Sequence, residues 1–266
     1  MYIIKASGKK EEFNPEKISR TLLRAGASKK LASEIVSQIE SKVKDGTTTR
    51  EILDSSLKLL REKNPTIEAR YDLKRAIMGL GPTGFPFERF FAEVLKNYGY
   101  ETKTGQTVQG TIINHEIDVV AEKDSKKYMI ECKYHNSLGV YTNIRAALYV
   151  YARFLDLKKK FNQPWLATNT KCSSKAISYA EGVGMKITGW QHPKNESLKD
   201  LIEKKKLYPV NILKSVNENI KGKFSKANII LAQDLLNQNI NDLKKKTGLS
   251  DNVLGQLIEE AKKVCG

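Results

Sequence analysis

Two patterns of apolar residues divide the chain. In residues 14–80, apolar side chains recur every three or four positions between polar ones, which predicts amphipathic helices. Residues 115–122 and 127–135 instead carry short apolar runs rich in β-branched and aromatic residues, and turn-forming residues 123–126 join them. This second pattern predicts two adjacent β-strands.

The first 80 residues are predicted to form a β-hairpin followed by four helices. "YIIK" and "KKEEF" are strand-like and flank a turn at Ser7-Gly8. Asn14 followed by proline predicts the start of the first helix, because asparagine caps helices and proline suits their first position. Ser28 and Thr49 predict the starts of the next two helices, and residues 66–81 predict the fourth.

The central region alternates helices and strands. Helices are predicted in residues 87–100, 141–161 and 173–184, and strands in residues 115–122, 127–135, 163–169 and 185–190. Strands that alternate with helices indicate an α/β layer with a partly parallel sheet. The remaining residues, 191–266, are lysine-rich and predicted to be helical.

A glycine- and proline-rich stretch marks the clearest boundary. "GLGPTGFP" at residues 79–86 holds three glycines and two prolines, too many for the interior of a helix or strand. We therefore expect a first domain at 1–80, a linker at 81–86, an α/β domain at 87–190 and a basic helical region at 191–266.

Charge and cysteine content narrow the functional class. The formal net charge is +16, from 46 basic and 30 acidic residues, which favours a polyanion such as DNA as partner over a merely soluble, lysine-rich surface. Three widely spaced cysteines without a CxxC pair argue against a disulfide framework or a structural zinc site. The sequence has neither a membrane-spanning apolar run nor the apolar core of a signal peptide, so we expect a cytoplasmic protein.

Carboxylates and a lysine accompany the two central strands. A hairpin that is symmetric about residues 123–126 brings Asp118 opposite Glu131, and Lys133 lies on the same face as Glu131. Adjacent carboxylates repel each other, and a divalent cation relieves that repulsion. The lysine then stabilises charge on a phosphate or helps to deprotonate water. The alternative is an exposed sheet face that carries charged pairs.

The same residues resemble the PD-(D/E)xK, or restriction-endonuclease-like, nuclease superfamily, in its Mrr-like branch. Asp118 and the Glu131-Cys132-Lys133 triplet match the signature, and the resemblance covers residues 85–190. It implies an αβββαβ core in which Asp118 and Glu131 bind Mg²⁺ or Mn²⁺ and Lys133 acts on the scissile phosphate. The family's first helix often carries a glutamate that supports the metal, and Glu88 matches it.

Three further polar residues flank this motif. His115 and Glu116 stand where the family often has small residues, and His135 follows the lysine closely. Each histidine is a candidate for orienting the site or shuttling a proton. Local hydrogen bonding is the equally weighted alternative.

The N-terminal 80 residues resemble the ATP cone, a nucleotide-sensing module of ribonucleotide reductases and their repressor. Three blocks match in order: "IIKASGKKEEFNPEKISRTLLRAGAS", "DGTTTREIL" and "LLREKNP". The resemblance implies that ATP or dATP is the effector. It assigns nucleotide contacts to Lys5, Glu11, Asn14, Lys17, Ile18 and Thr49. Ala6 replaces a family arginine, so binding is expected to be weaker or the module mainly structural.

The C-terminal residues resemble a degenerate helix-hairpin-helix. Gly248, Leu249 and Ser250 match its turn, which directs backbone amides at a DNA phosphate, and Lys246 precedes it. An ordinary helical hairpin is the alternative.

Together these features predict a metal-dependent DNA endonuclease that acts in restriction or DNA repair under nucleotide control. Two alternatives stay open. One is a nucleotide-responsive DNA-binding regulator with an inert nuclease core. The other is a junction resolvase, which would act as a homodimer.

Overall fold

The computed structural model describes residues 1–81, 85–137 and 139–266 and contains two compact units. The first unit comprises Met1–Ala76, Val210–Ala227 and Ala232–Gly266, and the second comprises Ile77–Pro209 and Asn228–Leu231. The chain therefore leaves the first unit, builds the second and returns. The predicted domain limits remain predictions. The predicted linker 81–86 includes residues 82–84, which lie outside the described residues. No helix in the described part of the chain is long and apolar enough to cross a membrane.

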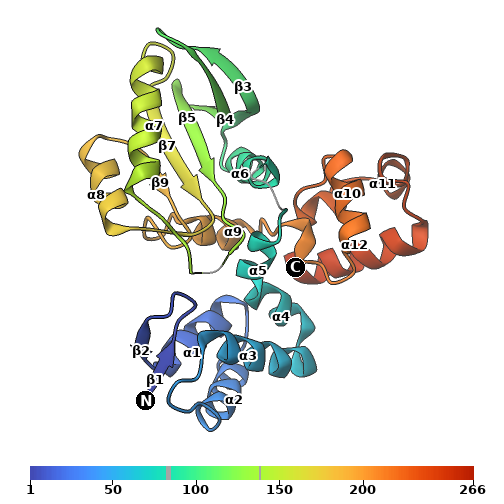
Figure 1. Cartoon of the computed structure of the whole chain (residues 1–266). Helices are drawn as coiled ribbons and strands as arrows, with labels where there is room; N and C mark the ends of the chain where they lie inside the picture. The colour runs from blue at the N-terminus through green and yellow to red at the C-terminus, as the bar shows by residue number, and fades with distance from the viewer. Residues whose placement is uncertain (82–84, 138) are drawn as a thin grey trace. The chain divides into compact units, whose positions relative to one another are not determined.

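The first unit is a small hairpin with helices from both ends of the chain (Figure 1). From the N-terminal part it takes β1 (Tyr2–Ile4), β2 (Lys10–Glu12), α1 (Pro15–Arg24), α2 (Lys29–Glu40), α3 (Thr49–Lys63), α4 (Pro65–Tyr71) and the start of α5 (Leu73–Met78). From the C-terminal part it takes η1 (Val210–Ile212), α10 (Glu218–Lys226), η2 (Ala232–Leu235), α11 (Ile240–Thr247) and α12 (Asp251–Cys265).

The caps of these helices confirm two predictions and correct a third, and a break at Asp72 corrects the predicted fourth helix. The side chain of Asn14 accepts from the Glu16 amide at 2.9 Å, and Ser28 caps α2 as predicted. The cap of α3 is Thr48, not Thr49, because Thr48 and Glu51 exchange hydrogen bonds in a capping box. The predicted fourth helix is two, because the backbone at Asp72 leaves the helical conformation between α4 and α5.

Within the first unit, the two ends of the chain are joined through α4. The guanidinium of Arg70 donates to the carbonyls of Val264 and Gly266 at 2.8 and 3.0 Å, which satisfies groups that a helix end leaves unpaired. The carboxylate of Glu68 is buried and accepts from Arg61 and Lys214. These contacts couple the N-terminal helices to α12.

The second unit is a five-stranded mixed sheet covered on both faces. Its elements are α6 (Phe85–Asn97), β3 (Glu101–Gln109), β4 (Asn114–Lys123), β5 (Lys126–Lys133), β6 (Tyr141–Thr142), α7 (Ile144–Leu157), β7 (Gln163–Thr168), β8 (Lys171–Cys172), α8 (Ser174–Gly182), β9 (Lys186–Thr188) and α9 (Leu198–Lys205). The strand order is β3-β4-β5-β7-β9, antiparallel from β3 to β5 and parallel from β5 to β9. The sequence α6-β3-β4-β5-α7-β7 is the predicted αβββαβ order, which is confirmed.

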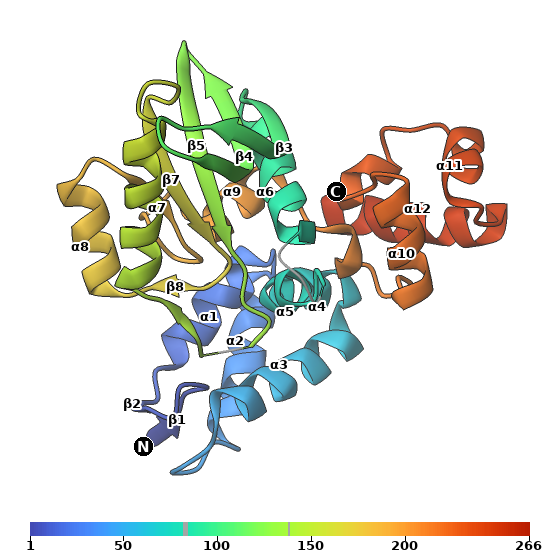
Figure 2. The same ribbon diagram turned by 45° about the horizontal axis from the view of Figure 1, so that its top comes forward.

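Helices α7 and α8 cover one face of this sheet, and α6 and α9 lie on the other (Figures 1 and 2). Val120, Met129, Leu166 and Ile187 belong to the apolar core that packs against α7 and α8. Side chains two positions apart on a strand share a face, so Glu131 projects on the same side as Met129. Trp165 and its neighbours in register, Ile130 and Lys186, project toward α6 and α9.

Candidate active site

The predicted register of β4 and β5 is confirmed. Val119 pairs with Ile130 and Ala121 with Tyr128, as symmetry about the turn requires. The ladder stops at the first of these pairs. Immediately beyond it, a carboxylate oxygen of Asp118 accepts the Cys132 amide at 2.7 Å. A side chain thus replaces the next backbone partner, which fixes the Asp118 carboxylate beside the residue that follows Glu131.

Glu131 is held by two cations. Its side chain is 8% exposed; Lys133 Nζ donates to Oε1 at 2.6 Å, and Arg153 of α7 donates to Oε2. Arg153 also donates to the backbone carbonyl of Glu116, so it ties α7 to both β5 and β4. Hydrogen-bonded pairing of this kind offsets part of the cost of burying a charged group.

The neighbouring acids are less well compensated. Burial, and then the charge of Glu131, raise the pKa of Asp118 to about 6, against the opposing effects of the Cys132 amide, Lys133 and Arg153. Burial, followed by the charges of Asp118, Glu131 and Glu116, raises the pKa of Glu88 to about 7. Four acids therefore gather where the first turn of α6 meets the middle of β4 and the end of β5, and two of them lack a sufficient counter-charge.

This arrangement fits a hard divalent cation. Among the described residues, no group of three or more His, Cys, Asp or Glu side chains forms a ready-made metal cage. Mg²⁺ does not require one, because it commonly binds one or two carboxylates and keeps waters or phosphate oxygens as its other ligands. Asp118 and Glu88 repel each other and would gain from such an ion. Glu131 would have to exchange a contact with Lys133 or Arg153 for the metal.

The two flanking histidines have other partners. His115 Nε2 lies 2.8 Å from Oδ2 of Asp156 on α7, and the Asp156 carboxylate also accepts the amides of Ile112 and Ile113. Burial alone would raise the pKa of Asp156, but these hydrogen bonds outweigh it and hold that pKa below its usual value. His115 therefore helps to fasten the β3–β4 turn to α7.

His135 lies in the segment after β5. Its ring lies 3.2 Å from the Thr142 hydroxyl, and its backbone exchanges hydrogen bonds with the side chain of Asn169. Glu116 is exposed and offers its backbone carbonyl to Arg153. The proposed catalytic roles of these three residues remain predictions.

Sequence reasoning missed Arg153 and Asp156. Both interrupt the apolar run of α7 and lie three positions apart, so they share a helix face. That spacing was the available signal, since an amphipathic helix usually keeps charge off its buried face. Their partners on β4 and β5 lie more than 20 residues away, and sequence spacing does not reveal such contacts.

Comparisons with known proteins agree with this geometry. Residues 82–194 match the family described as restriction endonuclease, residues 1–76 match the ATP cone domain, and residues 208–265 match a family described as AF1548-like, C-terminal. An uncharacterized protein of Archaeoglobus fulgidus is 45% identical over 176 residues, which are 66% of this chain and 99% of that protein. The chain belongs to the AF1548-like family.

A solved structure supports the fold of this AF1548-like chain. The crystal structure of AF1548, a protein of unknown function, is 43% identical and superposes with a TM-score of 0.62. The match covers 69% of this chain and 99% of that one. The two main resemblances, an N-terminal ATP cone and a restriction-endonuclease domain, are confirmed.

In the ATP cone, three of the six predicted nucleotide contacts lie together, with two lysines around one acid. Lys5 and Lys17 both pair with Glu11, and Asn14 caps the helix that carries Lys17. A bridge between Ile4 and Thr48 places the start of α3, and with it Thr49, beside the end of β1. Ile18 is buried in the core of the cone and offers little surface to a ligand.

The C-terminal hairpin of the AF1548-like chain forms where it was predicted. Gly248 ends α11 with φ of 62°, a left-handed conformation that favours glycine, and its amide donates to Lys244 at 2.8 Å. Ser250 caps α12. Lys246 donates to Gln238 at 2.7 Å. DNA contact by Gly248, Ser250 and Lys246 remains a prediction.

Proposed function

We propose that this protein is a DNA endonuclease that uses Mg²⁺ or Mn²⁺ and is regulated by ATP or dATP through its ATP cone. The observation that carries the proposal is the acid cluster. Asp118 and Glu88 have raised pKa values beside the Glu131–Lys133 pair, inside a domain of the restriction-endonuclease family. A site of this kind fits a divalent cation that holds a phosphate.

Each residue then has a distinct role. Asp118 and Glu131 would hold the cation, and Glu88 adds negative charge beside them. The chemistry that Mg²⁺ would supply there is polarisation of the phosphoryl group and acidification of a water molecule. Lys133, whose side chain is 37% exposed, stabilises the charge that develops on the scissile phosphate. Arg153 is 11% exposed and orients Glu131, so it acts as a positioning residue.

The ATP cone supplies a route for regulation. Glu11 neutralises Lys5 and Lys17 in the present conformation. Nucleotide phosphates would compete with Glu11 for these two lysines, since both anions bind ammonium groups by charge-assisted hydrogen bonds. Ala6 offers no guanidinium for the phosphates, so we expect modest nucleotide affinity.

Plasmid nicking and metal binding together test the proposal. Wild-type protein, Asp118→Asn and a matched control, Glu122→Gln, are incubated with supercoiled plasmid and Mg²⁺ or Mn²⁺, with and without ATP or dATP. Calorimetry measures metal binding to the same three proteins. Wild type and Glu122→Gln should bind metal and nick DNA, whereas Asp118→Asn should do neither. A wild-type protein that binds metal but cleaves no linear, supercoiled or branched DNA would overturn the proposal.

One observation favours a second function. Both carboxylate oxygens of Glu131 are already held by Lys133 and Arg153, which would suit a core that no longer binds metal. The protein would then be a nucleotide-responsive DNA-binding regulator. Effector-dependent DNA affinity without metal binding would support this second function. Preferential cutting of branched DNA by a dimer would identify a junction resolvase instead.

A further inference from the structure

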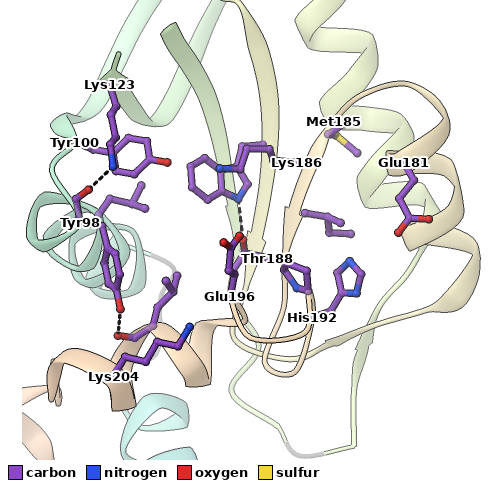
Figure 3. Close-up of a pocket in the computed structure, with 15 residues that line it drawn as sticks. Tyr98, Tyr100, Lys123, Glu181, Met185, Lys186, Thr188, His192, Glu196 and Lys204 are labelled. Carbon is purple, nitrogen blue, oxygen red and sulfur yellow. Dashed lines mark hydrogen bonds between the residues drawn. The ribbon is translucent and has the colours of Figure 1, made fainter. Parts of the chain in front are cut away.

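A second concave site lies in the same domain, at the opposite end of α6 from Glu88 and apart from the acid cluster. It is a pocket of about 430 Å³ between the end of α6, strands β7 and β9, residues 192–196 and α9 (Figure 3). This volume lies within the range of about 300–1,000 Å³ that small-molecule sites occupy. Neither the acid cluster nor the ATP cone contributes to its lining.

One part of the pocket is aromatic. The rings of Tyr100, Tyr128 and Trp165 meet edge to face with centroids 5.6–5.9 Å apart, and two of them, Tyr100 and Trp165, line the cavity. Leu95 and Met185 add apolar surface. A wall of this composition suits a flat, aromatic group.

The other feature is a set of lysines. Lys123, Lys186 and Lys204 line the cavity from three different elements. Lys123 donates to the Tyr98 carbonyl at 2.8 Å, Lys204 donates to the Asn195 carbonyl, and Lys186 Nζ lies 3.8 Å from the centroid of the Trp165 ring. These lysines are held by neutral groups, so their positive charges are not cancelled by close ion pairs.

The positive charge of Lys186 is destabilised in this pocket. Burial lowers the pKa of Lys186; the carboxylate of Glu196 opposes that shift, while Lys123 and Lys126 add to it. An anion near Lys186 would offset its repulsion by Lys123 and Lys126. A ligand that also carries an aromatic ring would fill the rest of the cavity.

We infer that this pocket binds one nucleoside monophosphate unit, its base against the aromatic wall and its phosphate near Lys186 and Lys204. Such a unit has two sources: a free mononucleotide, or a nucleotide of a displaced DNA strand. The second source rests on the proposed function, whereas the first does not. Base stacking on aromatic side chains tolerates any base, so no base preference is expected.

Titration of the full chain with dTMP, in the absence of divalent metal, tests the site. Tryptophan fluorescence is the direct readout, because Trp165 lines the pocket. Calorimetry with thymidine and with inorganic phosphate separates the contributions of base and phosphate. We expect dTMP to bind at least tenfold more tightly than either fragment alone.

Two variants and a matched control decide the location. Lys186→Met and Lys204→Ala should each weaken dTMP binding about tenfold, which corresponds to one charge-assisted contact. Lys199→Ala lies on the same helix as Lys204 but outside the lining, and should bind as wild type does. Because Lys204 is an exposed helix residue, its variant should fold even if Lys186→Met does not.

The remaining outcomes are equally decisive. Unchanged dTMP affinity in both variants, or no binding by wild type at millimolar dTMP, would overturn the inference. Displacement of dTMP by a short single-stranded oligonucleotide would identify DNA as the source, and failure to displace it would identify a free nucleotide. Asp118→Asn should bind dTMP normally, so loss of the proposed nuclease function would leave this test unaffected.

Discussion

Two places on the central sheet carry opposite charges. Glu131 projects toward α7, and beside it burial and the charge of Glu131 raise the pKa of Asp118 to about 6. On the other face, burial lowers the pKa of Lys186. Arg153 and Lys133 compensate Glu131 by ion pairs, whereas aromatic rings hold Lys186. Each place is therefore incompletely neutralised, and each fits a ligand of the opposite charge.

At the acid cluster, replacing Lys133 should have the largest effect on catalytic rate. Lys133→Met should lower the rate of DNA nicking by at least about 100-fold, because it removes the cation nearest the developing charge on the phosphate. The same change frees one oxygen of Glu131, so affinity for Mg²⁺ should stay equal or rise. Single-turnover cleavage and calorimetry measure the two effects. A parallel loss of metal affinity would show that Lys133 maintains the site rather than acting on the phosphate.

Replacing Arg153 tests how much the ion pairs of Glu131 contribute to the free energy of unfolding. Arg153→Met should lower the free energy of unfolding by about 2 kcal/mol, because Glu131 keeps only one cation and the Glu116 carbonyl loses its donor. Urea denaturation measures the change. Arg145→Met, on the same helix, is the matched control and should change it by less than about 0.5 kcal/mol. Equal effects of the two changes would mean that the Glu131–Arg153 pair contributes nothing specific.

Replacing Asp118 should change the free energy of unfolding in the opposite direction. Asp118→Asn retains an oxygen for the Cys132 amide but removes a charge that its neighbours repel, so the metal-free protein should become more stable by about 1–2 kcal/mol. Thermal unfolding at pH 8 measures this gain. Adding Mg²⁺ should raise the midpoint of the wild type and leave that of the variant unchanged, because only the wild type binds the ion. Destabilisation by Asp118→Asn without metal would refute the account of repelling acids.

Local features of the fold and of the acid cluster could be predicted from the sequence. The hairpin register that brings Asp118 to Glu131 followed from symmetry about one short turn, and local caps such as Asn14 followed from residue type. The cap of α3 was predicted one residue late although the sequence carried the signal: Thr48 stands three positions before Glu51, the spacing of a capping box, whereas Thr49 stands three before Ile52.

Long-range features were beyond the sequence signals. Arg153 reaches Glu131 across 22 residues, and the lysine pocket draws its lining from six helices and strands between Leu95 and Lys204. The return of the C-terminal helices to the N-terminal unit depends on contacts such as Arg70 with Val264. Such contacts are set by packing between distant segments, and the periodicity of one segment carries no record of its partner.

The smallest expected effect is that of replacing Lys186, and it tests the lysine pocket alone. Its pKa is lowered in the folded state, so between that value and the ordinary lysine pKa of about 10.4 the unfolded chain binds more protons than the folded one. The wild type therefore gains stability as pH rises through this window. Lys186→Met removes that gain. Relative to wild type, the variant should be more stable at pH 7, by less than about 1 kcal/mol, and its advantage should shrink toward pH 10.5.

Urea denaturation at pH 7, 9 and 10.5 measures this difference, with Lys199→Ala as control for a lysine outside the pocket. The control should differ from wild type by the same amount at every pH. Bound dTMP should shift the result, because an anion beside Lys186 favours its charged form and raises its pKa. The pH-dependent advantage of Lys186→Met should then disappear. If it persists unchanged under saturating dTMP, the nucleotide lies elsewhere, and the aromatic rings alone explain why a lysine is placed in this pocket.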